Sequence, residues 1–258
     1  MSFFKPITLL VIVAAFLFSC KKETKPSSPE TVNPIPADKT PLPQDSISFT
    51  IQEEKYVFSN IKTAGVGNLA MNIKPFKEVK DIGKLAYETG GYYWYGEPDS
   101  TLYSLFFEML SDDYNNRLSV SFNKKFKDSD LQKGTSLRKL TNNIIMFEPG
   151  KLPYAVDIEK ENTLEGICID FSGRRLNLNA STRVPGFSIL VRSDLDNNIQ
   201  SNSTFEITSL KHVRDEIYII EAKFEANLFD EQENAYRLKN GYMRIKGNMT
   251  NFLSPFFL

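Results

Sequence analysis

One histidine, His212, is present in the chain, so any chemistry that needs an imidazole depends on it. A single histidine excludes zinc sites built from several histidines and leaves one candidate base for a Ser-His-Asp hydrolase. The polar residues around it, Lys211, Arg214 and Asp215, are typical of a turn between strands. We therefore interpret His212 as an exposed turn residue. Since no serine lies in a G-x-S-x-G elbow, the sequence favours a protein without catalytic residues and leaves enzymatic activity open.

Three oxygen-bearing side chains, Asp194, Asp196 and Asn198, follow a D-x-D-x-N spacing. This spacing places oxygen ligands on one side of a loop, as calcium requires. The sixth position of the run is Ile199 and the twelfth is Phe205, where an EF-hand has glycine and glutamate. The run is therefore not an EF-hand. A looser calcium site stays as a hypothesis beside a plain Asp/Asn-rich turn, which the pattern favours, and no other cofactor is expected.

Aromatic residues gather between glycines in residues 90–96, which hold the single tryptophan, Trp94. In an extended strand, Tyr92 and Trp94 share one face. That face could stack against sugar rings, with Glu97 and Asp99 nearby to accept hydrogen bonds from hydroxyl groups. The alternative, which we favour, is that these aromatic rings pack in the interior or along a sheet edge.

Composition indicates the kind of fold that must position these side chains. With 41% apolar and 24% charged residues, the chain is typical of a folded protein with a real core. A formal net charge of -1 provides no basic field for a phosphate backbone, so no nucleic-acid partner is expected. The 20 Phe and 11 Tyr favour the half-buried surface of a sheet. We predict a mostly β protein: an antiparallel β-sandwich-like domain with at most one or two short helices.

Period-two alternation of apolar and polar residues supports this prediction. Ile47, Phe49 and Ile51 share one face and are followed by a polar turn and a return strand at residues 56–58, which predicts a hairpin. The best helical spacing runs from Phe76 to Leu85. Further strands are expected at residues 102–110, 117–122, 143–147, 155–159, 164–171, 187–191 and 205–210.

The longest alternation, at residues 217–228, predicts a strand with one wet face. After it, Asn240-Gly241 shifts the apolar alternation by one residue. This pair could form a hairpin turn or a bulge within one long strand. A hairpin would place Arg237 opposite Arg244, and like charges facing each other across strands are destabilising, so we favour the bulge.

One β-sandwich-like unit is expected over residues 46–258. The turn-rich segment 148–153 could instead divide two β units. At the carboxyl end, residues 252–258 are apolar enough to pack back onto the domain.

The first 45 residues indicate where the protein is located in the cell and not how it folds. Residues 1–19 read as a signal peptide, with an apolar run at 7–18 that is too short to cross a bilayer, which takes about 20 residues. Residues 20–45 contain prolines and few large apolar side chains, which is typical of a disordered tether. Cys168 lies in the apolar run 166–171 and is interpreted as a core residue.

Leu17-Phe18-Ser19-Cys20 resembles a lipobox. The resemblance implies cleavage before Cys20, diacylglycerol on its thiol and N-acylation by a fatty acid such as palmitate. The alternative is a secretory signal with an incidental cysteine. Position 21 is Lys, so the Asp that retains lipoproteins at the inner membrane is absent, and the outer membrane is the expected address, on either its periplasmic or its surface side.

With the proline-rich tether, the strand at 217–228 and the run Asn240 to Ile245, the chain resembles the β-sandwich envelope lipoproteins of unknown function found in Bacteroidota. That resemblance implies an address and a fold but no activity. We expect a non-catalytic, membrane-anchored binding module for a protein or glycan partner. The alternatives are a polymer-degrading hydrolase with an unrecognised site and an anchored subunit of a surface assembly.

Overall fold

A computed structural model describes residues 41, 43–59, 70–78, 94, 96–134, 138–156, 165–174, 176–185, 193–214 and 216–248. These residues belong to a compact unit that spans Thr40–Leu258. The predicted signal peptide, most of the tether, the strand at 187–191 and the packing of residues 252–258 lie outside the described residues. Within them, no helix has both the length and the apolar character needed to span a membrane.

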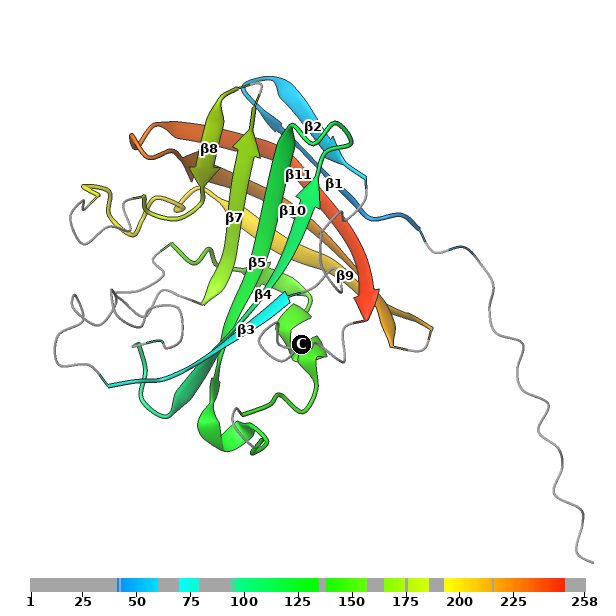
Figure 1. Ribbon diagram of the computed structural model, residues 1–258, viewed down its shortest axis with the longest axis vertical. Helices are drawn as coiled ribbons and strands as arrows, with labels where there is room; N and C mark the ends of the chain where they lie inside the picture. Colours follow the sequence, from blue (N-terminus) through cyan, green and yellow to red (C-terminus); the bar gives the residue numbers. More distant parts are fainter. Residues whose placement is uncertain are drawn as a thin grey trace, which may run out of the picture. The chain divides into compact units, whose positions relative to one another are not determined.

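The unit is built from antiparallel strands, as Figure 1 shows, which confirms the predicted mostly β fold. The strands form one 11-stranded sheet in the order β2-β1-β11-β10-β8-β7-β5-β4-β3, and β9 also pairs with β10 while β6 pairs with β9. The strands are β1 Ser46–Ile51, β2 Glu54–Phe58, β3 Ala70–Pro75, β4 Ser100–Leu110, β5 Asn116–Lys127, β6 Gly150–Leu152, β7 Gly166–Gly173, β8 Leu178–Ser181, β9 Thr204–Arg214, β10 Ile217–Phe229 and β11 Ala235–Asn248.

Apolar and polar residues alternate along the strands, so one face of the sheet is apolar. The sheet folds over, and the apolar face of one half packs against the apolar face of the other. Phe49 of β1 meets Phe171 of β7 edge to face, with ring centroids 5.5 Å apart. Phe122 of β5 meets Phe205 of β9 in the same way at 5.8 Å. Since each of these ring pairs joins strands that are not neighbours in the sheet, the core lies between two layers, β2-β1-β11-β10-β9 and β8-β7-β5-β4-β3.

The two layers separate along one edge of β10. Residues from Ile217 to Glu225 on this edge pair with β9, whereas Phe229 pairs with Ser181 of β8. Between these two partners, β10 has no strand beside it, and the backbone N–H and C=O of Asn227 face the gap. We call this point, where β9 and β8 diverge along β10, the fork. A buried or half-buried backbone amide without a partner is destabilising, so Asn227 at the fork needs another source of hydrogen bonds.

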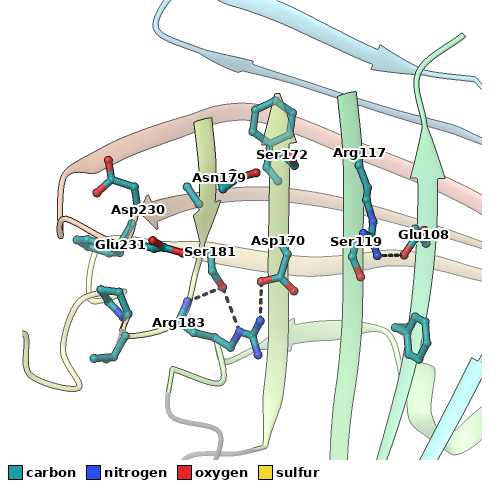
Figure 2. A pocket seen from close by; sticks show the side chains of 16 residues that line it. Glu108, Arg117, Ser119, Asp170, Ser172, Asn179, Ser181, Arg183, Asp230 and Glu231 are labelled. Atoms are coloured by element: carbon teal, nitrogen blue, oxygen red, sulfur yellow. Dashed lines mark hydrogen bonds and ion pairs between the residues drawn. The ribbon is translucent and has the colours of Figure 1, made fainter. Parts of the chain in front are cut away.

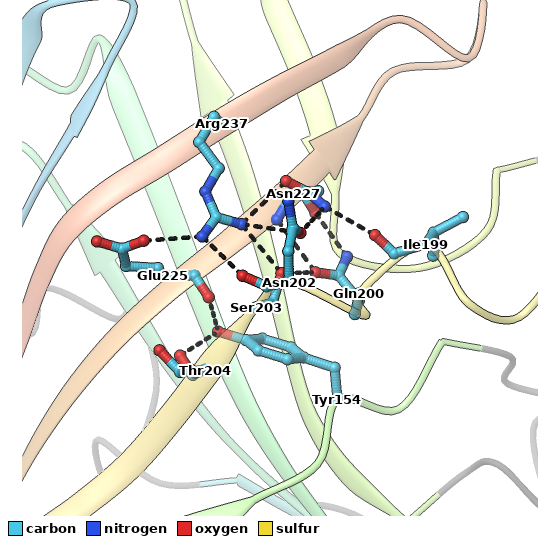
Figure 3. Close-up of polar contacts among 9 residues, drawn as sticks. All are labelled: Tyr154, Ile199, Gln200, Asn202, Ser203, Thr204, Glu225, Asn227 and Arg237. Atoms are coloured by element: carbon cyan, nitrogen blue, oxygen red, sulfur yellow. Dashed lines mark hydrogen bonds and ion pairs between the residues drawn. The ribbon is translucent and has the colours of Figure 1, made fainter.

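The side chain of Gln200 supplies those hydrogen bonds, as shown in Figure 3. Its Oε1 accepts from the N–H of Asn227 at 3.0 Å, and its Nε2 donates to the C=O of Asn227 at 2.7 Å. Nε2 also donates to the C=O of Thr182, just after β8, at 2.8 Å, and the Ser203 hydroxyl donates to Oε1 at 2.6 Å. The carboxamide of Gln200 therefore makes the hydrogen bonds that a neighbouring strand would make, and it joins both layers.

Arg237 of β11 makes further hydrogen bonds at the fork (Figure 3). Its guanidinium donates to Oδ1 of Asn227 at 3.0 Å and to the C=O of Asn202 at 2.9 Å, and it pairs with Glu225 at 2.7 Å. The hydroxyl of Tyr154 lies 3.0 Å from the C=O of Glu225. The loop of residues 199–203, which fills the fork, is thus bonded to β10, to β11 and to the residue that follows β8.

The bulge favoured from the sequence is confirmed: β11 runs unbroken through Asn240-Gly241, and its pairing with β10 shifts between Phe224 and Ala226. Asn240 takes the positive φ, 53°, whereas Gly241 is required by close approach. A Cβ on Gly241 would lie 2.4 Å from the carbonyl oxygen of Phe224 and 2.5 Å from its ring.

Several local predictions differ from the structure. Residues Asn143–Phe147 form a 3-10 helix instead of a strand, because Asn142 accepts a hydrogen bond from the N–H of Ile144 and the run buries Met146 and Phe147 together. Apolar residues in succession lack the alternation that a half-buried strand needs.

Two other predicted elements are only partly described. At the start of the predicted helix, Phe76 forms a β-bridge with Trp94, and residues 79–85 lie outside the described residues. In the predicted strand at 155–159, Ala155 and Val156 lie outside the named strands. The segment that could have divided two units instead contains β6, which pairs with β9.

Gln200→Glu tests the fork. The substitution keeps the acceptor oxygen but turns the donor toward two carbonyl oxygens into a second acceptor, so we expect the free energy of unfolding to fall by about 3 kcal/mol. Urea denaturation followed by circular dichroism measures this. As a control, the same change at the exposed Gln132 should alter stability by less than about 0.5 kcal/mol. Equal stability of the two variants would show that the carboxamide does not hold the fork.

Candidate functional site: a polar groove on the outer face

A groove of about 790 Å³ lies on the outer face of β4, β5, β7 and β8, and Figure 2 shows its lining side chains. Its floor is set by strand register: Glu108 faces Ser119, Ser119 faces Asp170, and Asp170 faces Ser181. Because these residues occupy outward positions of four adjacent strands, they form one row, about 14 Å long at about 4.8 Å per strand. A second row lies beside it and consists of Arg117, Ser172 and Asn179.

Two ion pairs cross the floor (Figure 2). Arg183 donates from NH2 to Asp170 at 2.8 Å, and its Nε donates to the hydroxyl oxygen of Ser181 at 3.1 Å, so its guanidinium is held against the sheet. On the other side, Arg117 pairs with Glu108. Each pair neutralises itself, which leaves a floor rich in hydrogen-bonding groups but with no net charge from these four residues.

The wall near β8 is a stiff turn that connects β10 and β11. Asp230 lines the groove, and its carboxylate accepts four hydrogen bonds, from the N–H groups of Gln232 and Asn234, the Asn234 side chain and the Tyr236 hydroxyl. Desolvation acts to raise the pKa of Asp230, but these hydrogen bonds outweigh it and hold the pKa below its usual value. Asp230 therefore stays ionised and shapes the wall instead of exchanging protons.

An aromatic side chain completes the groove. Phe106 lies two residues before Glu108 on β4, at an outward position, and its ring is half-buried among the polar lining. Serine hydroxyls, paired arginines and one aromatic ring are thus arranged on a rigid sheet.

Trp94 of the predicted stacking pair is 2% exposed and packs with Leu102 and Phe76. Its indole N–H donates to the carbonyl of Ser100 at 3.4 Å. In the structure its ring therefore offers no face to a ligand, in agreement with the packing alternative. Tyr92 lies outside the described residues.

The Asp194-to-Asn198 run forms a turn. Asp196 accepts hydrogen bonds from the N–H and the side-chain amide of Asn198, and the N–H of Asp194 donates to Glu233. No group of three or more His, Cys, Asp or Glu among the described residues is placed to hold a metal ion. The calcium hypothesis therefore gains no support from this geometry.

The predicted exposure of His212 is confirmed, but the residue lies within β9 and not in a turn. It faces Tyr218 of β10 with ring centroids 4.8 Å apart. The strand continues past it because Arg214 still pairs with Ile217.

The groove residues were not singled out from the sequence, although a signal for them exists. Glu108, Ser119 and Asp170 occupy alternate polar positions in strands that the alternation predicted. What the alternation does not reveal is that β5 and β7 are neighbours, since about 40 residues separate them along the chain.

Comparisons with protein-family models, with curated proteins and with solved structures gave no match for this chain.

Cys168 is 4% exposed, and its thiol lies 3.1 Å from the carbonyl oxygen of Ala155. Burial raises the pKa of this thiol to about 11. We expect its reaction with a thiol reagent at pH 8 to be at least about a hundredfold slower than in the urea-unfolded chain, because the thiolate is the reacting species. Absorbance of the released chromophore measures both rates, and comparable rates would show that the cysteine is accessible in the native sheet.

Proposed function

We propose that this protein is a lipid-anchored, non-catalytic binding lipoprotein of the outer membrane whose outer-face groove takes an uncharged, hydroxyl-rich ligand such as a glycan chain. The observation that carries the proposal is the in-register polar row Glu108, Ser119, Asp170 and Ser181, crossed by two ion pairs. The row is open at the surface and long enough to accept an extended chain.

The chemistry of the groove fits sugar hydroxyl groups. A sugar hydroxyl both donates and accepts, and the groove offers carboxylate acceptors beside serine hydroxyls and the Asn179 amide. Phe106 adds an aromatic face, which suits the C–H face of a sugar ring. Since the two floor ion pairs neutralise themselves and Asp230 and Glu231 are acidic, an anionic polymer gains little from this surface.

Binding is favoured over hydrolysis by the state of the carboxylates. A glycosidase needs one carboxylic acid that keeps a proton and a second carboxylate at a set distance from it. In this groove Glu108 and Asp170 each pair with an arginine, and Asp230 accepts four hydrogen bonds. Each of these three carboxylates is held by an arginine or by hydrogen-bond donors, an arrangement that suits acceptors of hydrogen bonds from ligand hydroxyl groups.

Anchoring at Cys20 is the second half of the proposal and is supported by the lipobox-like run 17–20 and the proline-rich residues that follow it. Acyl chains on this cysteine would hold the mature protein on the bilayer, since more than one chain is needed for stable attachment.

Asp170→Asn tests the groove on an array of neutral oligosaccharides probed with the detergent-solubilised mature protein. Loss of the carboxylate removes a charged acceptor and releases Arg183, so we expect binding to the best neutral oligosaccharide to weaken about tenfold to a hundredfold.

Glu225→Gln is the matched control, because it breaks an ion pair of similar length and exposure in the other layer. The Arg183–Asp170 pair measures 2.8 Å with side chains 25% and 39% exposed, and the Arg237–Glu225 pair measures 2.7 Å with 26% and 45%. The control should bind like the parent protein. Equal loss in both variants, or no binding of any neutral oligosaccharide by the parent, would rule out the groove as a glycan site.

Cys20→Ser tests the anchor. In a Gram-negative host, mass spectrometry of the parent protein should find Cys20 as the first residue carrying acyl chains, and the variant should lose them and leave the membrane fraction. An unmodified Cys20 in the mature parent protein would disprove the anchoring.

A further inference from the structure

Three neighbouring strands of the other layer, β11, β1 and β2, have a basic outer face. Along β11, β1 and β2, apolar residues such as Leu238, Ile47 and Phe58 point into the core, so the alternate positions point outward. Within these three described strands, the outward positions carry five cations and no carboxylate. The face that we call the basic face consists of Lys55, Lys239, Arg244 and Lys246, with Ser46, Ser48 and Thr50 between them.

Register brings these residues together. Thr50 faces Lys239 on one side and Lys55 on the other, and Ser46 faces Arg244. The cations of β2 and β11 are therefore separated by the small hydroxyl side chains of β1, which lies between these two strands. The fifth cation, Arg237, is excluded from the face because it pairs with Glu225.

The acids near the face border it and do not occupy the outward positions of β11, β1 and β2. The Asp45 carboxylate, just before β1, interacts electrostatically with Lys246 and Arg244. Glu221 of β10, opposite Arg244, accepts a hydrogen bond from the Tyr242 hydroxyl at 2.7 Å. Glu53 and Glu54 lie at one end of the face, in and beside the turn between β1 and β2. The whole chain has a net charge of only -1, so the basic face is a local concentration of charge.

An apolar side chain lies on the same surface. Val57 occupies an outward position of β2, faces Ser48, and is 53% exposed. Among the described strands, β2 lies at the edge of the sheet, and Val57 is on its outward side. Cations around an exposed apolar residue are typical of proteins that lie on anionic bilayers.

The described chain enters the domain beside this face. Arg244 donates from Nε to the carbonyl of Gln44 at 3.1 Å, and the Asp45 carboxylate accepts from the N–H of Lys246 at 2.7 Å. The segment that leads toward Cys20 is thus clamped to two strand positions of the basic face. Gln44 and Asp45, on the amino-terminal side of β1, therefore lie against the basic face.

We infer that the basic face docks onto an anionic lipid surface, with Lys55, Lys239, Arg244 and Lys246 contacting headgroup phosphates. The choice of a membrane over another anion rests on the proposed anchoring. Docking through this layer leaves the groove, on the outer face of the other layer, open to its ligand.

The test uses a chain that starts at Lys21 and therefore lacks acyl chains, so its result does not depend on lipidation of Cys20. This chain retains the whole compact unit from Thr40. It is sedimented with vesicles of phosphatidylcholine and phosphatidylglycerol, and with vesicles of phosphatidylcholine alone. We expect binding to the anionic vesicles only, and loss of binding when NaCl rises from about 0.1 M to about 1 M, which shortens the Debye length from about 10 Å to about 3 Å.

Charge reversal locates the surface. Lys55→Glu with Lys239→Glu should lower the partition coefficient at least about thirtyfold, because each cation near an anionic bilayer contributes about a fivefold factor. Lys127→Glu with Lys133→Glu is the control: both lysines are exposed, neither belongs to the basic face, and the net charge changes equally. The control should lose far less.

Three results would overturn the inference. They are equal binding to neutral vesicles, equal loss in the two double variants, and binding of a soluble polyphosphate or DNA by a chain that ignores anionic vesicles. If lipidation of Cys20 fails while anionic binding is kept, the anchor is refuted and the docking face stands.

Discussion

The rest of the structure depends on how β10 shares one edge between two strands. A strand has one row of hydrogen-bonding groups along each edge, and on β10 this row pairs first with β9 and then, at Phe229, with β8. Asn227 lies between these partners, and the Gln200 carboxamide satisfies its N–H and C=O. Because the same carboxamide reaches Thr182, it joins both layers at the point where they separate. The bridge satisfies the backbone groups that the opening of the sheet into two layers leaves without a strand partner.

Because the sheet folds on itself, its apolar residues point into the interior and its polar residues form two separate outer faces. The aromatic side chains that point inward, such as Phe49, Phe122 and Phe171, meet across the interior. Outward positions are then free to differ between the layers: one carries the groove, which is crossed by two ion pairs, and the other carries a group of cations on β2 and β11. The proposed glycan groove and the proposed lipid-docking face therefore lie on different layers of one domain.

The polar groups on the floor of the groove are held in place by the sheet and by one another. Its floor residues are held by strand register, and Arg183 is held by Asp170 and Ser181, so little side-chain freedom is lost when a ligand arrives. Catalysis would need groups that change protonation state or attack a substrate. The one buried thiol, Cys168, has a pKa of about 11, and burial keeps it as a packing residue.

The sequence by itself determined the strands with a clear period of two, the bulge at Asn240 and the burial of Cys168, because alternation, like-charge repulsion and local apolar context act over a few residues. It also determined that His212 would be exposed. Only the tertiary structure decided that Asn143–Phe147 coils into a 3-10 helix, that Gln200 fills the fork, and that Glu108, Ser119 and Asp170 share a row. These features depend on which strands become neighbours. That choice is made by packing between segments far apart in the chain, so a pattern of a few residues does not predict it.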